Sequence, residues 1–258
     1  CFADDQTAHT EDTLDPLRDA ETVETELMLA DLETAEGVKS RLEKVLRSNP
    51  RASEHREFET VTKIVEGLQK GQTVRELALS VEEVDKIKGF QFLTSKPILY
   101  VANAGEDDVP EGCELTNRLK ERVGPAQVLI ISARIEWEIS QLGPEDRKAF
   151  ESELGLAESR VGELIEKGYR MLDLISFYTV ANEKLQAWQF ERGGTTPTAA
   201  GKIHTDMEEG FIRAEVANYE DMIAAGSFER LRSGGKLRTE GKGYVVEDGD
   251  VIHFLFGT

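Results

Sequence analysis

Two short apolar runs constrain the fold of this chain more than any other feature of its sequence: KPILYVAN at 96–103 and AQVLIISA at 126–133. Each has the composition of a buried strand and ends at a loop, and a helical segment is predicted between them near 113–122. Strand, loop, helix and strand in this order are typical of an α/β sheet, in which ligands bind at the loops that follow the strands. We therefore predict parallel strands with ligand loops at their carboxyl ends.

A helical hairpin is predicted upstream of these strands. The Asp-Pro pair at 15–16 is a favourable helix start, and a strongly helical pattern continues from it to an Asn-Pro break at 49–50. A second amphipathic helix is predicted from about 53 to 71, and a shorter one over 77–87. Because a short connection joins the two longer helices, they are expected to pack as an antiparallel hairpin.

The remainder of the chain changes from helices to strands. Helices are predicted near 134–142, 144–153 and 157–172. The alternating runs LISFYTV and KLQAWQF then predict a β-hairpin, and GFIRAEV, YVV and VIHFLF predict further strands with short helical pieces between them. These segments form a small α+β module over 173–257, which is within ordinary domain size.

Composition excludes several classes of protein. With 50 acidic against 31 basic residues the net charge is −19, which argues against a general nucleic-acid coat protein. Cys1 and Cys113 form neither a disulfide framework nor a zinc motif, so we expect a reducing cytosol. We also predict no membrane segment and no signal peptide. The opening Cys1-Phe2 has the character of a strand end, which predicts a start truncated within a sheet.

The loop after the first apolar run, Asn103-Ala104-Gly105-Glu106, resembles the base-recognition loop of P-loop GTPases. In that loop an Asn holds the purine, and an Asp carboxylate accepts hydrogen bonds from N1–H and N2–H₂ of guanine. Here Glu106 is one methylene longer and Ala104 replaces the usual Lys, so we expect the preference to relax toward adenine. A capped turn between strand and helix is the alternative interpretation of this loop taken alone.

A second loop strengthens the nucleotide interpretation. Ser132 and Ala133 follow the second predicted strand within IISAR (130–134), and they resemble the SAK-type loop whose backbone amides approach the base. Two such loops, in the expected order and each after a strand, are more specific than either alone. Trp137 and Trp188 are predicted to be packing residues.

The C-terminal module carries the longest resemblance. WQFERGGTTPTAAGKIHTDMEEGFIRAEV and LRTEGKGYVVEDGDVIHFLF resemble the TGS domain of YchF-type, Obg-like ATPases, and DPLRDAETVETELMLADLE (15–33) resembles the entry of that family into its helical hairpin. The resemblance spans nearly the whole chain and keeps the family's order of elements. The chain is therefore similar to the C-terminal part of such a protein.

This resemblance implies a fold that combines α/β and α+β parts. Residues 1–151 would be the C-terminal part of an OBG-type G domain: a partial P-loop NTPase (Rossmann-like) sheet, interrupted by the helical hairpin at about 15–89. Residues 152–172 would be a connecting helix, and 173–257 a β-grasp TGS domain. The family binds and hydrolyses ATP in preference to GTP and associates with ribosomes, which places it in the cytoplasm.

Carried over residue by residue, the resemblance also implies a base site. Asn103 would contact the adenine edge, Ala104 would lie against the base, and Glu106 would take the specificity position. Ser132 and Ala133 would flank the base from the other side.

The sequence departs from the family's pattern in one large respect. It contains no GxxxxGK[ST] loop and no switch segment to hold Mg²⁺ and the γ-phosphate. GGTTPTAAGK (193–202) is not such a loop, since its glycine spacing is too long and Lys202 precedes Ile203. The intact protein would use ATP, more weakly GTP, and Mg²⁺. Phosphate contacts supply most of the affinity, so we expect this chain alone to bind ATP weakly or not at all and to hydrolyse none.

Two basic clusters are candidates for binding ribosomal RNA. One surrounds the predicted hairpin tip and the other lies in the C-terminal module: Arg41, Lys44, Arg47 and Arg51 in the first, and Arg230, Arg232, Lys236 and Arg238 in the second. Two interpretations are open: solvated surfaces, or contacts with the RNA backbone that are salt-sensitive and independent of sequence. The resemblance favours the second, without specific DNA binding. A non-catalytic ribosome- or RNA-binding module, made of the hairpin and the C-terminal module, is the alternative to an ATPase part.

Overall fold

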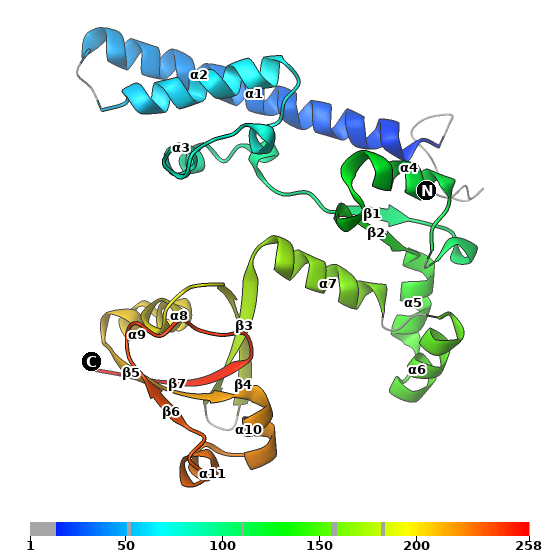
Figure 1. Cartoon of the computed structure of the whole chain (residues 1–258), viewed down its shortest axis with the longest axis vertical. Helices are drawn as coiled ribbons and strands as arrows, with labels where there is room; N and C mark the ends of the chain where they lie inside the picture. Colours follow the sequence, from blue (N-terminus) through cyan, green and yellow to red (C-terminus); the bar gives the residue numbers. More distant parts are fainter. Residues whose placement is uncertain (1–13, 51–52, 110, 156–158, 182–183, 258) are drawn as a thin grey trace. The chain divides into compact units, whose positions relative to one another are not determined.

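The computed structural model describes residues 14–50, 53–109, 111–155, 159–181 and 184–257, and the arrangement of its elements is drawn in Figure 1. The chain divides into two compact units, residues 1–164 and 165–258. The first unit combines a helical hairpin with a small α/β part, and the second is built on an antiparallel-rich sheet. This mixed α/β character agrees with the fold class expected from the sequence.

The hairpin consists of α1 (Pro16–Ser48) and α2 (His55–Gln69), which lie side by side in Figure 1. The predicted start of α1 is confirmed: Pro16 is its first residue, and the Asp15 carboxylate accepts hydrogen bonds from the backbone N–H groups of Leu17 and Arg18. Such a cap satisfies amides that have no partner within the helix. The hairpin core is apolar, with Ala35, Leu42, Val61, Ile64, Val65 and Leu68 buried.

The chain returns from the hairpin through short helical turns: η1 (Val74–Glu76), α3 (Val81–Ile87), η2 (Lys88–Phe90) and η3 (Leu93–Ser95). Asp31 of α1 fixes the end of this segment. Its buried carboxylate accepts hydrogen bonds from the backbone N–H groups of Leu93 and Thr94, both at 2.7 Å, and from Thr94 Oγ1 at 2.6 Å. A buried carboxylate requires such donors, so these bonds attach the returning segment to α1.

The α/β part contains β1 (Tyr100–Asn103) and β2 (Val128–Ile131), which pair in parallel. Between them lie η4 (Glu106–Asp108), α4 (Glu114–Val123) and η5 (Pro125–Gln127), and α5 (Ala133–Gln141) and α6 (Pro144–Glu153) follow. The predicted order of strand, helix and strand is confirmed. Both strands are shorter than the apolar runs, because Pro97 lacks an N–H for a ladder and η5 begins with Pro125.

The predicted helix at 157–172 is observed as α7 (Arg160–Met171), whose start is capped from a distance. Glu136 of α5 is buried, and its carboxylate accepts hydrogen bonds from Ser159 Oγ at 2.6 Å and from the backbone N–H of Arg160 at 2.8 Å. α5 therefore determines where α7 begins. Within the described ranges, no helix has an apolar stretch long enough to cross a membrane.

The C-terminal unit carries, among its described residues, a sheet of five strands in the order β4-β3-β7-β5-β6. The strands are β3 (Leu174–Ala181), β4 (Lys184–Glu191), β5 (Phe211–Asn218), β6 (Arg238–Glu240) and β7 (Asp250–Phe256). Neighbours are antiparallel except β3 and β7. The helices are α8 (Thr196–Ile203), α9 (Thr205–Glu209), α10 (Tyr219–Ala225) and α11 (Phe228–Ser233).

The predicted hairpin at 174–191 is confirmed by the antiparallel pairing of β3 with β4. The prediction of a strand at YVV (244–246) is wrong, because this segment forms an isolated bridge between Val245 and Thr195 and no strand. Its place beside β5 is taken by β6, whose Arg-Thr-Glu sequence has no apolar residue to predict a strand. Gly201 and Lys202 lie in the last turn of α8, which agrees with rejecting 193–202 as a phosphate loop, since such a loop precedes its helix.

Candidate nucleotide-base site

The loops after β1 and β2 meet at one edge of the sheet. The two strands are parallel, and Asn103 and Ile131 are partners in their register. The backbone N–H of Ala104 donates to the Ile131 carbonyl at 2.8 Å, which extends the pairing by one residue beyond β1. The predicted residues Asn103, Ala104, Glu106, Ser132 and Ala133 are thereby brought together from positions about thirty apart in the sequence.

A side-chain hydrogen bond links the two loops directly. Asn103 Oδ1 accepts from the backbone N–H of Ala133 at 3.1 Å. Ser132, which is buried, caps the same helix, since its Oγ accepts from the Ile135 N–H at 3.5 Å. Asn103 and Ser132 therefore accept hydrogen bonds from amides at the start of α5. The predicted site residues that are exposed to solvent are Asn103, Ala133 and Glu106.

Arg134 joins the site as a residue that the sequence reasoning missed. Its Nε lies 3.0 Å from Glu106 Oε1, on the other loop, and 3.4 Å from Glu138 Oε1, one turn further along α5. A signal was present, because Arg134 directly follows Ser132-Ala133, at the position of the Lys in the SAK-type loop. The carboxylate predicted to determine base specificity is thus ion-paired with the second loop.

Close packing at Gly112 supports the segment that follows the β1 loop. Gly112 has φ +95°, and a β-carbon at this position would overlap Thr116 Oγ1 and Ile130 Cδ1. Thr116 Oγ1 also accepts from the Cys113 N–H and donates to the Cys113 carbonyl, both at 2.8 Å. Only glycine fits this turn, which returns the loop to the start of α4.

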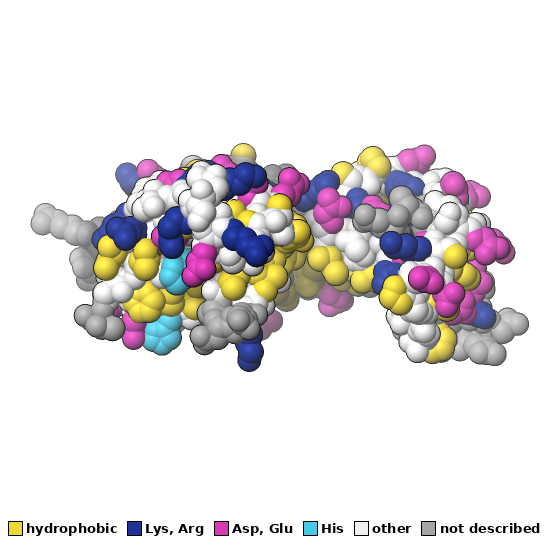
Figure 2. All heavy atoms as spheres, turned by 90° about the horizontal axis from the view of Figure 1, so that it is seen from below, with side chains coloured by type: hydrophobic (Ala, Val, Ile, Leu, Met, Phe, Trp, Pro, Cys, Tyr) yellow, Lys and Arg dark blue, Asp and Glu magenta, His cyan; other side chains and the backbone are white. Residues whose placement is uncertain are grey.

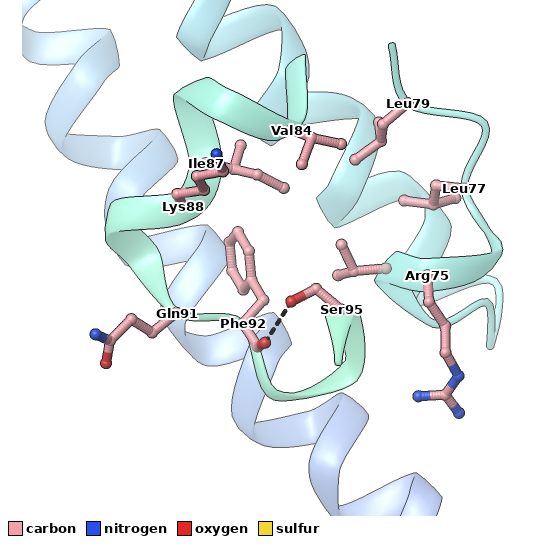
Figure 3. A pocket seen from close by; sticks show the side chains of 10 residues that line it. Arg75, Leu77, Leu79, Val84, Ile87, Lys88, Gln91, Phe92 and Ser95 are labelled. Atoms are coloured by element: carbon pink, nitrogen blue, oxygen red, sulfur yellow. Dashed lines mark hydrogen bonds between the residues drawn. The ribbon is translucent and has the colours of Figure 1, made fainter. Parts of the chain in front are cut away.

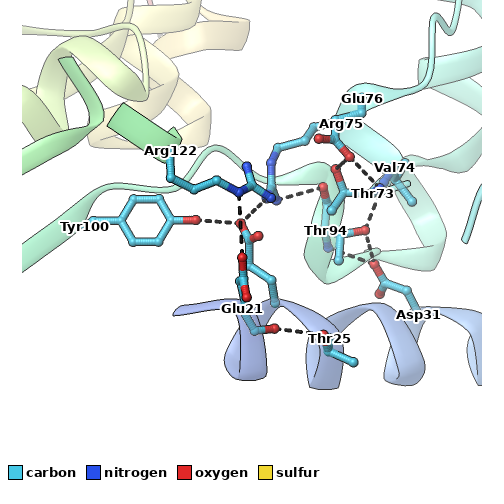
Figure 4. Close-up of polar contacts among 11 residues, drawn as sticks. Glu21, Thr25, Asp31, Thr73, Val74, Arg75, Glu76, Thr94, Tyr100 and Arg122 are labelled. Carbon is cyan, nitrogen blue, oxygen red and sulfur yellow. Dashed lines mark hydrogen bonds and ion pairs between the residues drawn. The ribbon is translucent and has the colours of Figure 1, made fainter. Parts of the chain in front are cut away.

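A polar cluster attaches β1 to the hairpin (Figure 4). Glu24 Oε1 on α1 accepts from Tyr100 Oη at 2.5 Å and is paired with Arg75 Nη2 at 2.9 Å. Burial, with a smaller contribution from the hydrogen bond to Glu24, raises the pKa of Tyr100 to about 12. Because Tyr100 begins the strand that ends at Asn103, this cluster connects the helical hairpin to the base loops.

A hollow of about 320 Å³ lies elsewhere in the same unit and has a mixed polar and apolar lining (Figure 3). Leu77, Leu79, Val84 and Phe92 are among its lining residues. Arg75 also lines it, but its guanidinium is paired with Glu24 and bonded to the Thr94 carbonyl at 3.2 Å. The hollow includes none of the base-loop residues, and no set of ionisable groups converges on it.

The residues present do not fit a Mg²⁺ site. Among the described residues, no three or more His, Cys, Asp or Glu side chains are grouped closely enough to hold a metal ion.

The two tryptophans lie in different surroundings. Trp188 is half-buried and stacks on Phe177, with ring centroids 6.5 Å apart, as expected of a packing residue. The same expectation is wrong for Trp137, whose side chain is 65% exposed on α5. α5 contributes Ile135 and Ile139 to the core instead, and Trp137 falls on its outer face, one turn after Arg134.

The basic cluster of the hairpin is exposed. Arg41, Lys44 and Arg47 are exposed near the end of α1, while Arg51 lies outside the described residues. Arg47 is paired with Glu43 at 2.7 Å, and the Arg41 guanidinium lies 6.0 Å from the centre of the Phe90 ring. These contacts are at the surface and leave the cations accessible to solvent.

The C-terminal basic cluster is engaged within its own unit. Arg232 contacts both carboxylate oxygens of Glu215, at 2.7 and 2.8 Å, and Lys236 is paired with Asp221 at 2.6 Å. Arg230 donates weakly to the Ala225 carbonyl at 3.4 Å. On the face drawn in Figure 2, Lys and Arg side chains are scattered among acidic and apolar ones.

Arg238 contacts the buried carboxylate of Asp250. It donates to Tyr244 Oη at 2.9 Å and lies 3.4 Å from Asp250 Oδ1, while Tyr244 Oη donates to Asp250 Oδ2 at 2.8 Å. Burial raises the pKa of Asp250, and burial with the hydrogen bond to Asp250 raises the pKa of Tyr244. These contacts give Arg238 a structural role within the sheet.

This chain is similar to a protein-family model, to curated proteins and to solved structures. Residues 174–257 match the family model YchF-GTPase_C, described as a protein of unknown function (DUF933). The chain is 40% identical to the ribosome-binding ATPase YchF of Bacillus subtilis (strain 168) and 37% identical to that of Escherichia coli O157:H7. Each match covers 99% of this chain and 70% of the relative.

Solved structures give the same result. The YchF GTPase of Schizosaccharomyces pombe is similar with a TM-score of 0.84 and 28% identity, over 98% of this chain and 70% of that one. A GTP-binding protein of Pyrococcus horikoshii OT3 shares the fold, with a TM-score of 0.53 and 17% identity, over 96% of this chain and 73% of that one. With 40% identity over nearly its whole length, the chain belongs to the YchF family.

Proposed function

We propose that this chain supplies the base-recognition part of an ATP-preferring, ribosome-associated NTPase. One observation carries the proposal: the loops after two parallel strands are joined by the hydrogen bond between Asn103 Oδ1 and the Ala133 N–H, with Glu106 at their exposed edge. Sites at the carboxyl ends of parallel strands are where α/β folds bind nucleotides. The relatives named ribosome-binding ATPases support the same assignment.

The preference for ATP follows from the chemistry of Glu106. A carboxylate reads guanine by accepting from the adjacent N1–H and N2–H₂ groups, and adenine offers no such donor pair. The longer side chain of Glu106 displaces its carboxylate from the position that an Asp would hold. Its pairing with Arg134 at 3.0 Å holds it further toward the second loop. We therefore assign Asn103 and Ala133, at the exposed edge, to holding the base, and Glu106 to discriminating it. Ala104 and Ser132 are buried and are assigned to supporting these residues.

Hydrolysis requires groups that are not among these residues. The sequence has no phosphate-binding loop, and its described residues assemble no Mg²⁺ site. The relatives are about one and a half times as long as this chain, which covers 70% of them. We propose that ATP, GTP more weakly, and Mg²⁺ are used by a protein of that length, and that these residues alone bind the base weakly and hydrolyse nothing.

The partner proposed for both units is the ribosome, in the cytoplasm. The C-terminal unit is assigned as a TGS domain of β-grasp type, and α1 with α2 as the hairpin insertion of an OBG-type G domain. Arg41, Lys44 and Arg47 are exposed on the hairpin and supply a cationic surface for an RNA backbone. Arg230, Arg232 and Lys236 are assigned a weaker role, because they already contact groups within their own unit.

Competition with a fluorescent ATP analogue tests the nucleotide part of this proposal. The chain is expected to bind ATP with millimolar or weaker affinity and GTP more weakly still. Glu106→Asp should restore the shorter carboxylate and raise GTP affinity relative to ATP, whereas Lys148→Glu, an exposed change on α6, should leave the ratio unaltered. Equal binding of ATP and GTP by wild type, unaffected by Glu106→Asp, contradicts the proposal.

A non-catalytic ribosome- or RNA-binding module is the second candidate, favoured by the exposed cations on α1. Co-sedimentation with ribosomes separates the two candidates. Binding that is lost on Arg47→Glu, retained on Lys148→Glu and unaffected by ATP favours the module. Binding that responds to ATP favours the NTPase.

A further inference from the structure

The ion pair between Glu106 and Arg134 has a bearing on which base the site accepts. The two residues come from different loops, and Arg134 Nε lies 3.0 Å from Glu106 Oε1 and 3.4 Å from Glu138 Oε1. Both side chains are solvent-accessible, with 48% of Glu106 and 74% of Arg134 exposed. The Nε–H of Arg134 donates to Glu138, and Glu106 is its ion-pair partner across the loops. A base bound between the loops would therefore meet a carboxylate that is already paired with a cation.

Guanine and adenine respond differently to such a carboxylate. Guanine binds through two adjacent donors, N1–H and N2–H₂, which require the carboxylate to turn both oxygens toward the base. Arg134 competes for one of these oxygens and for the orientation of the group. Adenine has a single amino donor on that edge, beside an acceptor nitrogen, so it does not need both oxygens.

We propose that Arg134 is a specificity-determining residue that holds the Glu106 carboxylate away from guanine and so favours adenine. The inference rests on the proposed function, because it requires the two loops to bind a base. Arg134 acts through Glu106 as a positioning residue and makes no contact with the base itself. An exposed ion pair of this kind corresponds to about a two- to fivefold effect on an equilibrium constant.

The ratio of ATP to GTP affinity isolates this effect from simple charge. Both nucleotides carry the same phosphates, so losing a cation near the site weakens both equally and leaves the ratio unchanged. Loss of the ion pair that orients Glu106 changes the affinity for GTP and leaves that for ATP unaltered. Arg134→Ala is therefore expected to lower the ratio about two- to fivefold, chiefly by improving GTP binding.

Two further variants serve as matched comparisons. Arg134→Lys keeps a cation able to reach Glu106 and should restore most of the ratio. Glu138→Gln removes the other carboxylate partner of Arg134, so the guanidinium stays with Glu106 and the ratio should remain at or above that of wild type. Both positions lie at the surface of α5, and circular dichroism verifies that each variant keeps its helices.

The experiment is ligand-observed saturation-transfer NMR on the full chain, with ATP and GTP titrated separately at millimolar concentration. A ratio that falls in Arg134→Ala and recovers in Arg134→Lys supports the inference. Binding of both nucleotides with an unchanged ratio in Arg134→Ala overturns it while leaving the proposed function intact. If neither nucleotide shows transfer with wild type, these residues do not hold a base by themselves and the inference fails, while the function proposed for a protein of the relatives' length is not contradicted.

Discussion

Each unit of the chain holds a carboxylate paired with an arginine, and the two pairs differ in their surroundings. Glu106 and Arg134 lie at the surface, with side chains 48% and 74% exposed. Asp250 is only 3% exposed, and it is bonded to Tyr244 Oη and the Glu247 N–H as well as paired with Arg238. The carboxylate is therefore exposed in one pair and buried in the other, where Arg238 is itself 48% exposed.

The difference separates a structural pair from one that can exchange its partner for a ligand. A buried carboxylate is destabilising unless its oxygens have donors, so the bonds of Asp250 to Tyr244 Oη and to the Glu247 N–H are part of the fold of this unit. An exposed pair contributes little to stability because water competes for both charges. Glu106 can therefore turn toward a base without loss of the fold, and the burial of the carboxylate distinguishes the two pairs.

Matched amide substitutions give the largest test of this contrast, beginning with Asp250→Asn. The change turns an N–H₂ group toward the buried donors Tyr244 Oη and the Glu247 N–H, so we expect a loss of about 3 kcal/mol in unfolding free energy. In a Trp137→Phe background, Trp188 is the remaining tryptophan and reports on the C-terminal unit. Denaturant unfolding followed by the fluorescence of Trp188 measures the loss. A value below about 0.5 kcal/mol would contradict a structural role for Asp250.

Gly112→Ala is expected to have the next largest effect, about 2 kcal/mol, since the β-carbon overlaps Thr116 and Ile130 and φ is +95°. Gly124→Ala is the matched control, because Gly124 also has φ +95° but a β-carbon added there would meet no atom within 4 Å. It should cost about 1 kcal/mol. Hydrogen exchange at the β2 amides measures both variants. Equal losses would show that the packing beneath the first base loop does not matter.

Tyr100→Phe should have a smaller effect, about 1 kcal/mol, because it removes one hydrogen bond to Glu24 while Arg75 remains. The loss should be local, so amide exchange is expected to accelerate in β1 and at the adjoining part of α1. Glu24→Gln should cost more, since it weakens both contacts of the cluster. Unchanged exchange in β1 after Tyr100→Phe would mean that the hairpin and the base loops are not coupled through this cluster.

Glu106→Gln, the exposed counterpart of Asp250→Asn, should have the smallest effect on stability, below about 0.5 kcal/mol. Its effect is expected in nucleotide binding, where the loss of charge weakens discrimination between ATP and GTP. Hydrogen exchange at the β2 amides and nucleotide competition measured on the same preparation check both expectations. A stability loss comparable to that of Asp250→Asn would make Glu106 a structural residue.

Local patterns in the sequence were sufficient to predict the elements that build the site. The apolar runs gave the order of strand, helix and strand, and the Asp-Pro pair marked the start of α1, because these signals act within a few residues. The meeting of the loops after Asn103 and Ile131 followed from parallel pairing. The family resemblance supplied the roles of the residues, which remain predictions.

The rest depends on partners that are distant in the sequence. Asp31 bonds to Thr94, 63 residues away, and Glu136 caps α7 from α5, so no local pattern marks either carboxylate as structural. β6 was missed because Arg238 and Glu240 are polar, and it forms only through its pairing with β5. Arg238 was assigned to RNA binding from its charge, whereas its contact with buried Asp250 depends on how the sheet folds.

We propose above that the loops after β1 and β2 form a site that binds an adenine base. Chemical-shift mapping of backbone amides during titration of the chain with ATP tests it most directly. We predict that shifts concentrate at 103–106 and 132–134, and that GTP produces smaller shifts at the same amides. Shifts confined to the hollow beside α3 or to the C-terminal sheet, with none at these loops, would contradict it.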